Sequence, residues 1–188
     1  MANHVCPWWL GYLLASPLRR LFQDPEKILA PYIEKGMKVL DFGCAMGFFS
    51  LPSARMAGRD GRVICIDLQE KMIRSLEKRA AKAGLSDRIE TRVCAQNSFG
   101  TEDIAGEMDF ALAFAVVHEV PDRDGLFSAL HKTLKPEGKL LVAEPPSHVT
   151  AEEFSNTVTA AQRAEFEIID RPKIKRSHTV LLRKKTNT

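Results

Sequence analysis

VLDFGCAMGFFS, at residues 39–50, is the stretch that decides the fold prediction. An apolar run ends at Asp41, and a turn of small residues then leads into a predicted helix. Gly43 and Gly47 permit backbone conformations, and a close approach of a ligand, that a side chain would block. Open α/β sheets bind their ligands outside the carboxyl ends of the strands. We therefore expect a ligand-binding turn here.

Apolar runs and helical patterns alternate along the rest of the chain. The runs predict strands at residues 37–42, 62–67, 89–94, 108–115 and 139–144. They are continuously apolar, which is typical of parallel strands covered on both faces. Apolar residues at helical spacing predict helices over residues 69–83 and 122–134. This alternation indicates an α/β fold with a doubly wound, mostly parallel sheet.

The two ends of the chain carry different patterns. Residues 151–163 predict a helix, and residues 166–169 and 179–182 predict an antiparallel pair of strands at the sheet edge. Near the other end, Asp24 is expected to cap a helix that starts at Pro25 and that Gly36 closes. 

Composition excludes several classes of protein. The 188 residues are 45% hydrophobic and 27% charged, with a net charge of +3, which fits a soluble single domain better than a basic nucleic-acid-binding module. Four cysteines are scattered along the chain, namely Cys6, Cys44, Cys65 and Cys94. We expect them to be free thiols in a reducing compartment rather than ligands of a metal site. The apolar stretch at residues 7–14 is too short to span a membrane. We therefore expect a cytoplasmic protein.

A dinucleotide site is one interpretation of the turn after residue 42. The G-x-G-x-x-G fingerprint would place a glycine at position 48, where this chain has Phe48. This departure disfavours a nicotinamide-dependent oxidoreductase.

The sequence resembles the class I S-adenosylmethionine-dependent methyltransferases, in particular their small ubiquinone/menaquinone-biosynthesis-like group (methyltransferase types 11 and 25). The resemblance covers about residues 34–185. Asp41-x-Gly43-x-Ala45-x-Gly47 matches the first motif of the family, with Ala45 in place of the middle glycine. Residues 109–115 match its fourth strand, and residues 134–140 match the turn before the fifth, with Glu137 at the first glycine. The resemblance implies a seven-stranded, Rossmann-like sheet.

The resemblance also implies S-adenosylmethionine as the cofactor and S-adenosylhomocysteine as the product. The implied cofactor-binding residues are Asp41, Gly43, Cys44, Ala45, Gly47, Asp67, Leu68, Gln96, Asn97, Phe114 and Ala115. Asp67 would accept the ribose hydroxyls, and Leu68 would lie against the adenine. Gln96 and Asn97 stand where the family often has an aspartate near the adenine amino group. No metal is predicted.

Methyl transfer requires orientation of the acceptor, and for some acceptors removal of a proton. His118 and Glu119 are the candidate catalytic residues, because the resemblance places residues 115–122 near the transferred methyl group. The alternative, which we favour on sequence alone, is that both residues only position the loop by hydrogen bonds. Glu144 is a further candidate for the acceptor site wall.

The partner expected from this sequence is a small-molecule acceptor. Residues 115–122 lack the Asn/Asp-Pro-Pro-Tyr sequence of enzymes that methylate bases and amides, and the basic stretch at residues 171–185 fits a solvated hairpin as well as an RNA contact. An S-adenosylmethionine-binding module without transfer activity is the alternative function.

We expect residues 36–188 to form the methyltransferase domain and residues 1–35 a helical, aromatic segment. Trp8, Trp9 and Tyr12 would make that segment a lid or a structural strap. The oligomeric state is not predicted.

Overall fold

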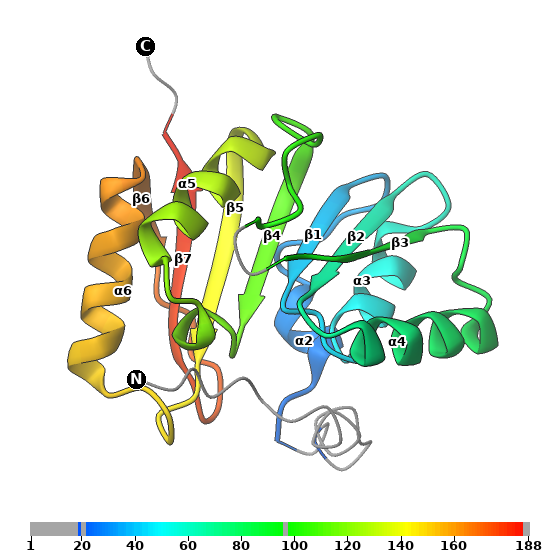
Figure 1. Ribbon diagram of the computed structural model, residues 1–188, viewed down its shortest axis with the longest axis horizontal. Helices are drawn as coiled ribbons and strands as arrows, with labels where there is room; N and C mark the ends of the chain where they lie inside the picture. Colours follow the sequence, from blue (N-terminus) through cyan, green and yellow to red (C-terminus); the bar gives the residue numbers. More distant parts are fainter. Residues whose placement is uncertain (1–18, 20–21, 96–97, 186–188) are drawn as a thin grey trace. The chain divides into compact units, whose positions relative to one another are not determined.

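The computed structural model describes residues 19, 22–95 and 98–185 (Figure 1). Predictions about Trp8, Trp9 and Tyr12, and about Gln96 and Asn97, lie outside these residues. The chain divides into two compact units, one ending at Gly100 and the other starting at Thr101.

The first unit alternates helices and parallel strands. In chain order these are α2 (Pro25–Leu29), β1 (Lys38–Phe42), α3 (Ser50–Ala57), β2 (Arg62–Asp67), α4 (Glu70–Ala83) and β3 (Ile89–Val93). β2 pairs in parallel with β1 on one side and with β3 on the other. α3 packs against β1 and β2, while α4 packs against β2 and β3 (Figure 1). β1 and β2 are apolar because helices and neighbouring strands enclose them.

Helix α2 starts as predicted but ends early. The Asp24 side chain accepts hydrogen bonds from the backbone N–H groups of Glu26 and Lys27, which confirms the cap. The expectation that Gly36 closes this helix is wrong, since the helix ends at Leu29. Pro31 lacks the N–H group that would continue the hydrogen-bond ladder, and its ring clashes with the preceding turn.

Strand β3 also differs from its prediction. Residues 89–93 form the strand, but they are half-buried to exposed rather than covered on both faces. The sequence IETRV holds a glutamate and an arginine, and Arg92 pairs with Glu90 at 2.6 Å. Among the strands of the first unit, β3 has a hydrogen-bonded neighbour only in β2.

The second unit contains the remaining predicted strands. Its elements are β4 (Met108–Phe114), the 3-10 helix η2 (Val117–Glu119), α5 (Arg123–Thr133), β5 (Leu134–Glu144), α6 (Ala151–Arg163), β6 (Phe166–Asp170) and β7 (His178–Lys184). β4 and β5 are parallel, whereas β7 runs antiparallel to both β5 and β6. This arrangement confirms the antiparallel pair after the last helix.

Strand β5 begins earlier than the predicted residue 139. Met108 pairs with Leu134, and the next pair joins Phe110 to Lys139, so residues 135–138 form an irregularity inside the strand. Glu137 has a φ of 64°, a left-handed conformation that favours glycine. The predicted turn is therefore a bulge in a longer strand, and α5 ends at Thr133 instead of residue 134.

The chain thus has the predicted fold class, α/β with seven mostly parallel strands and an antiparallel edge hairpin. In the part of the chain that the structure describes, no helix is both long and apolar enough to cross a bilayer.

Candidate active site

The turn after β1 is held against the end of β2. The N–H groups of Gly43 and Cys44 both donate to the carbonyl oxygen of Ile66, at 2.8 and 3.0 Å. The N–H group of Ala45 donates to Oδ2 of Asp67 at 2.9 Å. Gly43, Ala45 and Gly47 all have positive φ values, of 74°, 47° and 80°. The backbone therefore bends sharply three times within five residues.

Asp67 connects this turn with the helix that follows β2. Its Oδ1 accepts a hydrogen bond from the N–H group of Gln69 at 2.8 Å, while Oδ2 holds Ala45. Burial raises the pKa of this carboxyl group, and these backbone hydrogen bonds oppose the rise. A carboxylate has about four lone-pair sites, so both oxygens can accept further hydrogen bonds.

Two apolar side chains are exposed beside Asp67. Leu68 is 36% exposed, and Val93, which pairs with Asp67 in the β2–β3 register, is 50% exposed. The carboxyl ends of β2 and β3 therefore combine an acid with apolar surface.

Asp41, the acid of the predicted first motif, is buried with 3% of its surface exposed. Its Oδ2 accepts a hydrogen bond at 2.5 Å from the hydroxyl group of Ser50, the first residue of α3. Burial raises the pKa of Asp41 to about 6; the Asp67 charge adds to the rise, and the Ser50 hydrogen bond and Arg19 oppose it. Asp41 thus binds the first residue of α3 and places a buried, titratable group at the end of β1.

Gly47 is required by packing. A Cβ at this position would lie 2.2 Å from Cδ1 of Leu76, a fully buried residue of α4. The adjacent Phe48 is buried and stacks edge-on against Phe49 at 5.1 Å between ring centroids. The position at which a dinucleotide fingerprint needs a glycine is thus occupied by a packed aromatic ring.

Arg19 is part of this site, although the sequence analysis did not identify it. Its guanidinium group lies 4.3 Å from the centroid of the Phe48 ring and 5.6 Å from that of Phe49. Burial lowers the pKa of Arg19 to about 10, and the charge of Asp41 opposes that change. No local pattern marks this residue, because only the folded chain brings it to the turn.

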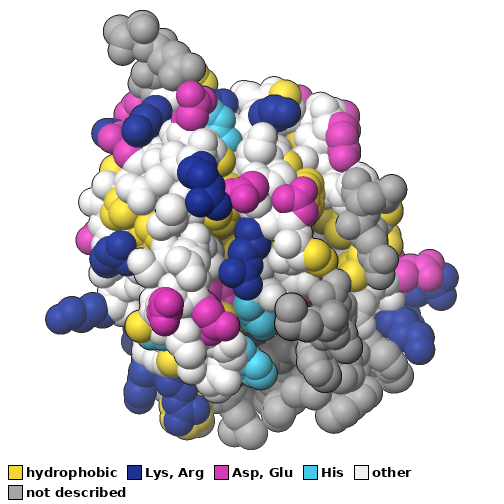
Figure 2. All heavy atoms as spheres, turned by 60° about the vertical axis from the view of Figure 1, so that its left-hand side comes forward, with side chains coloured by type: hydrophobic (Ala, Val, Ile, Leu, Met, Phe, Trp, Pro, Cys, Tyr) yellow, Lys and Arg dark blue, Asp and Glu magenta, His cyan; other side chains and the backbone are white. Residues whose placement is uncertain are grey.

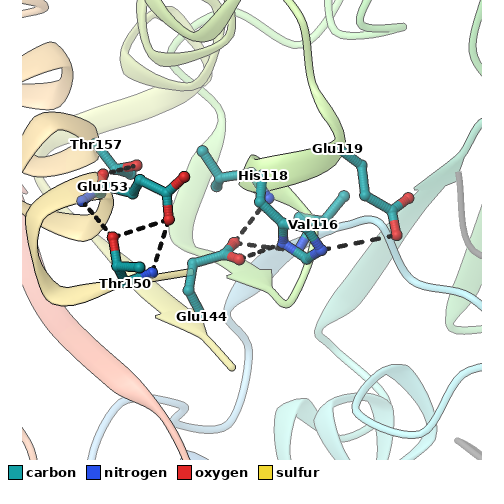
Figure 3. A network of polar contacts seen from close by, with 8 residues as sticks. Val116, His118, Glu119, Glu144, Thr150, Glu153 and Thr157 are labelled. Carbon is teal, nitrogen blue, oxygen red and sulfur yellow. Dashed lines mark hydrogen bonds and ion pairs between the residues drawn. The ribbon is translucent and has the colours of Figure 1, made fainter. Parts of the chain in front are cut away.

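The second unit places another polar group at the carboxyl ends of β4 and β5. Glu144, the last residue of β5, is 1% exposed. Its Oε1 accepts hydrogen bonds from the N–H groups of Val116 and Val117, at 3.2 and 2.8 Å, and its Oε2 contacts Nδ1 of His118 (Figure 3). From the sequence, Glu144 was only a candidate for the wall of the acceptor site, whereas in the structure its side chain binds the loop that carries His118.

Two further side chains, those of Glu119 and His148, lie beside the His118 ring. Nε2 lies 4.0 Å from Oε1 of Glu119, and the ring of His148 stacks on that of His118 with 5.6 Å between centroids. Hydrogen bonding to Glu144 raises the pKa of His118 and outweighs the lowering by burial. Histidine side chains lie beside one another on the visible surface, flanked by acidic and basic side chains (Figure 2).

The other predicted cofactor-binding residues that the structure describes are Cys44, Phe114 and Ala115. Ala115 has a φ of 58° and donates its N–H to the carbonyl oxygen of Ala143 at 2.7 Å, while Phe114 is buried with 8% exposed. Cys44 is buried, and burial raises the pKa of its thiol. Within the described ranges, no three His, Cys, Asp or Glu side chains gather in a way that could hold a metal ion.

Direct hydrogen bonds thus join Ala45 to Asp67 in the first unit, and His118 to Glu144 in the second. Both groups lie at the carboxyl ends of their strands, where α/β folds bind ligands. The α/β fold and the turn after β1 thus define a class of protein that binds its ligands at the carboxyl ends of the strands.

Comparison with known proteins identifies the family. Residues 33–184 match the sequence profile of a methyltransferase domain. The ubiquinone biosynthesis O-methyltransferase of Bartonella bacilliformis is 31% identical over 137 residues, which make up 73% of this chain and 51% of that protein. The tRNA 5-carboxymethoxyuridine methyltransferase of Escherichia coli is 31% identical over 124 residues, or 64% of this chain and 44% of the relative.

A solved structure has the same fold. The crystal structure of an S-adenosylmethionine-dependent methyltransferase from Aquifex aeolicus superimposes with a TM-score of 0.84 at 23% identity, covering 95% of this chain and 98% of that one. The chain spans about half the length of the curated relatives it matches. It belongs to the methyltransferase-domain family, in the class I S-adenosylmethionine-dependent group that its first motif resembles.

Proposed function

We propose that this chain binds S-adenosylmethionine and transfers its methyl group to a small-molecule acceptor. The hydrogen bond between Ala45 and Asp67 carries the proposal, because it joins the glycine-rich turn to the acid that ends β2. One ligand that spans these two elements would contact both the turn backbone and a carboxylate.

The residues around Asp67 fit an adenosine. The two carboxylate oxygens retain acceptor capacity for the ribose hydroxyls, which are neighbouring donors. Leu68, exposed on the adjacent position, offers an apolar surface for the adenine ring. Gln96 and Asn97 remain predicted contacts of the adenine.

The turn itself fits the amino-acid end of the cofactor. Gly43 has no side chain to obstruct a ligand, and Ala45 has only a methyl group. The N–H groups of Gly43, Cys44 and Ala45 are satisfied within the protein, so the turn keeps its shape without a ligand. The buried Asp41 carboxylate, near the end of the strand that leads into the turn, would provide negative charge for an ammonium group.

S-adenosylmethionine, when bound, supplies an electrophilic methyl group on a sulfonium. The protein then has to orient the acceptor, exclude water and accept a proton where the acceptor loses one. His118, with Glu119 beside it, is the candidate for the proton-accepting role. Phe114 and Ala115, at the end of β4, are proposed to line the cofactor side of this loop.

A small acceptor is favoured over a nucleic acid. The Bartonella relative is named for ubiquinone biosynthesis, and residues 115–122 lack the motif expected for base nitrogens. The relative from Escherichia coli is named for tRNA, so transfer to tRNA is the competing outcome of the test.

Calorimetry with S-adenosylmethionine, S-adenosylhomocysteine and NADH tests the cofactor. We expect saturable binding of the first two and none of NADH, and binding of NADH alone would contradict the proposal. Incubation with radiolabelled S-adenosylmethionine and either a small-molecule extract or bulk tRNA then tests the acceptor. Label should pass to the small-molecule fraction; transfer to tRNA alone, or to neither fraction, would refute that part.

A further inference from the structure

Helix α4 meets the turn after β1 at two adjacent positions of that turn. Leu76, on the buried face of the helix, leaves no room for a Cβ at Gly47, so the helix packs directly against this glycine. About one turn further along the helix, Nη1 of Arg79 donates a hydrogen bond to the carbonyl oxygen of Met46, which lies 33 positions away in the sequence. The helix and the turn both belong to the first unit.

Met46 and Gly47 share one peptide group, and both of its polar ends are bound. The N–H group of Gly47 donates to the carbonyl oxygen of Cys44 at 2.9 Å, inside the turn. The carbonyl oxygen of Met46 accepts from Arg79, outside the turn. Because a peptide group is planar, it cannot rotate without breaking one of these two hydrogen bonds. Arg79 therefore helps to fix the orientation of this peptide group.

The two halves of the turn are held by different elements. Strand β2 holds the first half, because Ile66 and Asp67 accept hydrogen bonds from the N–H groups of residues 43–45. In the second half, Gly47 has a φ of 80°, and a glycine can leave such a conformation more easily than other residues can. The hydrogen bond from the N–H group of Leu51 to the Gly47 carbonyl oxygen is 3.3 Å long. The contact with Arg79 thus restrains the more permissive half.

An arginine suits this role better than a neutral donor would. Its guanidinium group is always charged, and hydrogen bonds from charged donors are stronger than those from neutral donors. Arg79 is half-buried, beside the fully buried face of α4. Arg74, on the same helix, instead forms an ion pair with Glu70 at 2.7 Å and has 67% of its side chain exposed. The contact with the turn therefore distinguishes Arg79 from a surface arginine of its own helix.

We propose that Arg79 is a positioning residue of the cofactor site, which holds the peptide group between Met46 and Gly47 in the orientation that receives the amino-acid end of S-adenosylmethionine. This inference rests on the proposed function and adds a residue of α4 to the site. A turn that is fixed in advance loses less conformational freedom when a ligand binds, so the ligand binds more tightly.

The adenosine end of the cofactor should not depend on Arg79. That end is assigned to Asp67, whose carboxylate is held by the N–H groups of Ala45 and Gln69 rather than by the peptide group that Arg79 binds. A positioning role for Arg79 therefore predicts a loss of affinity that is confined to ligands with an amino-acid end. A general role in stability would affect every ligand of the site alike.

Amide hydrogen exchange tests the positioning without any ligand. In Arg79→Met, which removes the donor, the N–H group of Gly47 should exchange about 10-fold faster or more, because its peptide group opens more often. The N–H group of Val63 in β2, which donates to the carbonyl oxygen of Arg88 at 2.8 Å, should keep its rate. An unchanged rate at Gly47, or an equal acceleration at Val63, would overturn the proposal. If Arg79→Met does not fold, Arg79→Gln, with a neutral donor on a shorter side chain, replaces it under the same expectations.

Calorimetry with two ligands tests which end of the site depends on Arg79. S-adenosylhomocysteine has an adenosine and an amino-acid end, whereas methylthioadenosine lacks the amino acid. Arg79→Met should weaken binding of the first about 5- to 20-fold and leave binding of the second unchanged, and Arg79→Lys, which keeps a charged donor, should recover part of the loss.

Arg74→Met is the matched control, because it makes the same exchange on the same helix and removes only the ion pair with Glu70. It should leave both affinities unchanged. Equal losses for the two ligands in Arg79→Met, or an unchanged affinity for S-adenosylhomocysteine, would overturn the proposal. An unaltered protein that binds neither ligand would instead refute the proposed function, and the exchange rates at Gly47 would still report whether Arg79 holds the turn.

Discussion

Replacing Asp41 by asparagine should change how stability depends on pH. Burial raises the pKa of this carboxyl group from its ordinary value of 3.8 to about 6. Between these two values the folded protein binds the proton that the unfolded chain has released. The free energy of unfolding therefore falls as pH rises from about 4 to about 6, because the native state must give up a proton that it binds more tightly.

The size of the effect follows from the difference between the two pKa values. At about 1.4 kcal/mol for each pH unit, charging Asp41 in the folded state costs about 3 kcal/mol above pH 6. Asp41→Asn keeps an oxygen for the hydroxyl group of Ser50 but adds an amide NH2 group that needs a partner, at a cost of about 1 kcal/mol. We expect the variant to be more stable than the parent by about 2 kcal/mol at pH 7, and less stable by about 1 kcal/mol near pH 4.

Urea unfolding at a series of pH values between 4 and 7.5 measures this crossover. The exposed Asp60→Asn is the control, and its stability difference from the parent should stay nearly constant over the range. A difference for Asp41→Asn that is independent of pH, or that changes in the parent's favour as pH rises, would refute the reasoning.

Two further substitutions test the backbone of the turn. Gly47→Ala should lower the free energy of unfolding by about 3 kcal/mol, because φ is 80° and the new Cβ would meet Leu76 at 2.2 Å. Chemical denaturation measures this loss, and a loss below about 1 kcal/mol would contradict the packing argument. Ala45→Gly should raise the free energy of unfolding by about 0.5–1 kcal/mol, because glycine adopts the left-handed backbone conformation of this position without the strain of an alanine. The affinity for S-adenosylmethionine, measured by calorimetry, should not change, because the N–H group that binds Asp67 remains. A destabilised Ala45→Gly variant would show that the alanine is not strained.

Local signals in the sequence were sufficient where local chemistry decides the structure. Asp24 before Pro25 predicted the start of α2. Apolar residues at helical spacing predicted α4, in which Met72 and Leu76 are buried. Gly84 ends α4 in the left-handed conformation, which glycine adopts without strain. In each case, the residues that determine the outcome lie within a few positions of one another.

Predictions were wrong where pairing or a competing local residue prevailed. Pro31 ends α2 before Gly36 can act, and a hydrogen-bonded pair between Met108 and Leu134 extends β5 through the apparent turn. Strand β3 contains charged residues, so its burial pattern departs from that of β2.

Of the candidate site, only the residues of the sequence motifs could be predicted from the sequence. Asp67 stands out because it ends an apolar run, but its hydrogen bond to Ala45 joins positions 22 residues apart. Glu144 and His118 are 26 residues apart, and neither sequence neighbourhood indicates the pairing. Arg19 reaches Phe48 only in the folded chain.

Titration of the protein with S-adenosylmethionine, before and after Asp67→Asn, tests the cofactor assignment most directly. A hydrogen bond to a charged acceptor contributes roughly 1.5–3 kcal/mol, so the dissociation constant should rise about 10- to 100-fold. The matched control, Asp87→Asn, alters an exposed acid of the same unit and should leave the affinity unchanged. A parent protein without measurable affinity, or an Asp67→Asn variant that binds as tightly as the parent, would contradict the account.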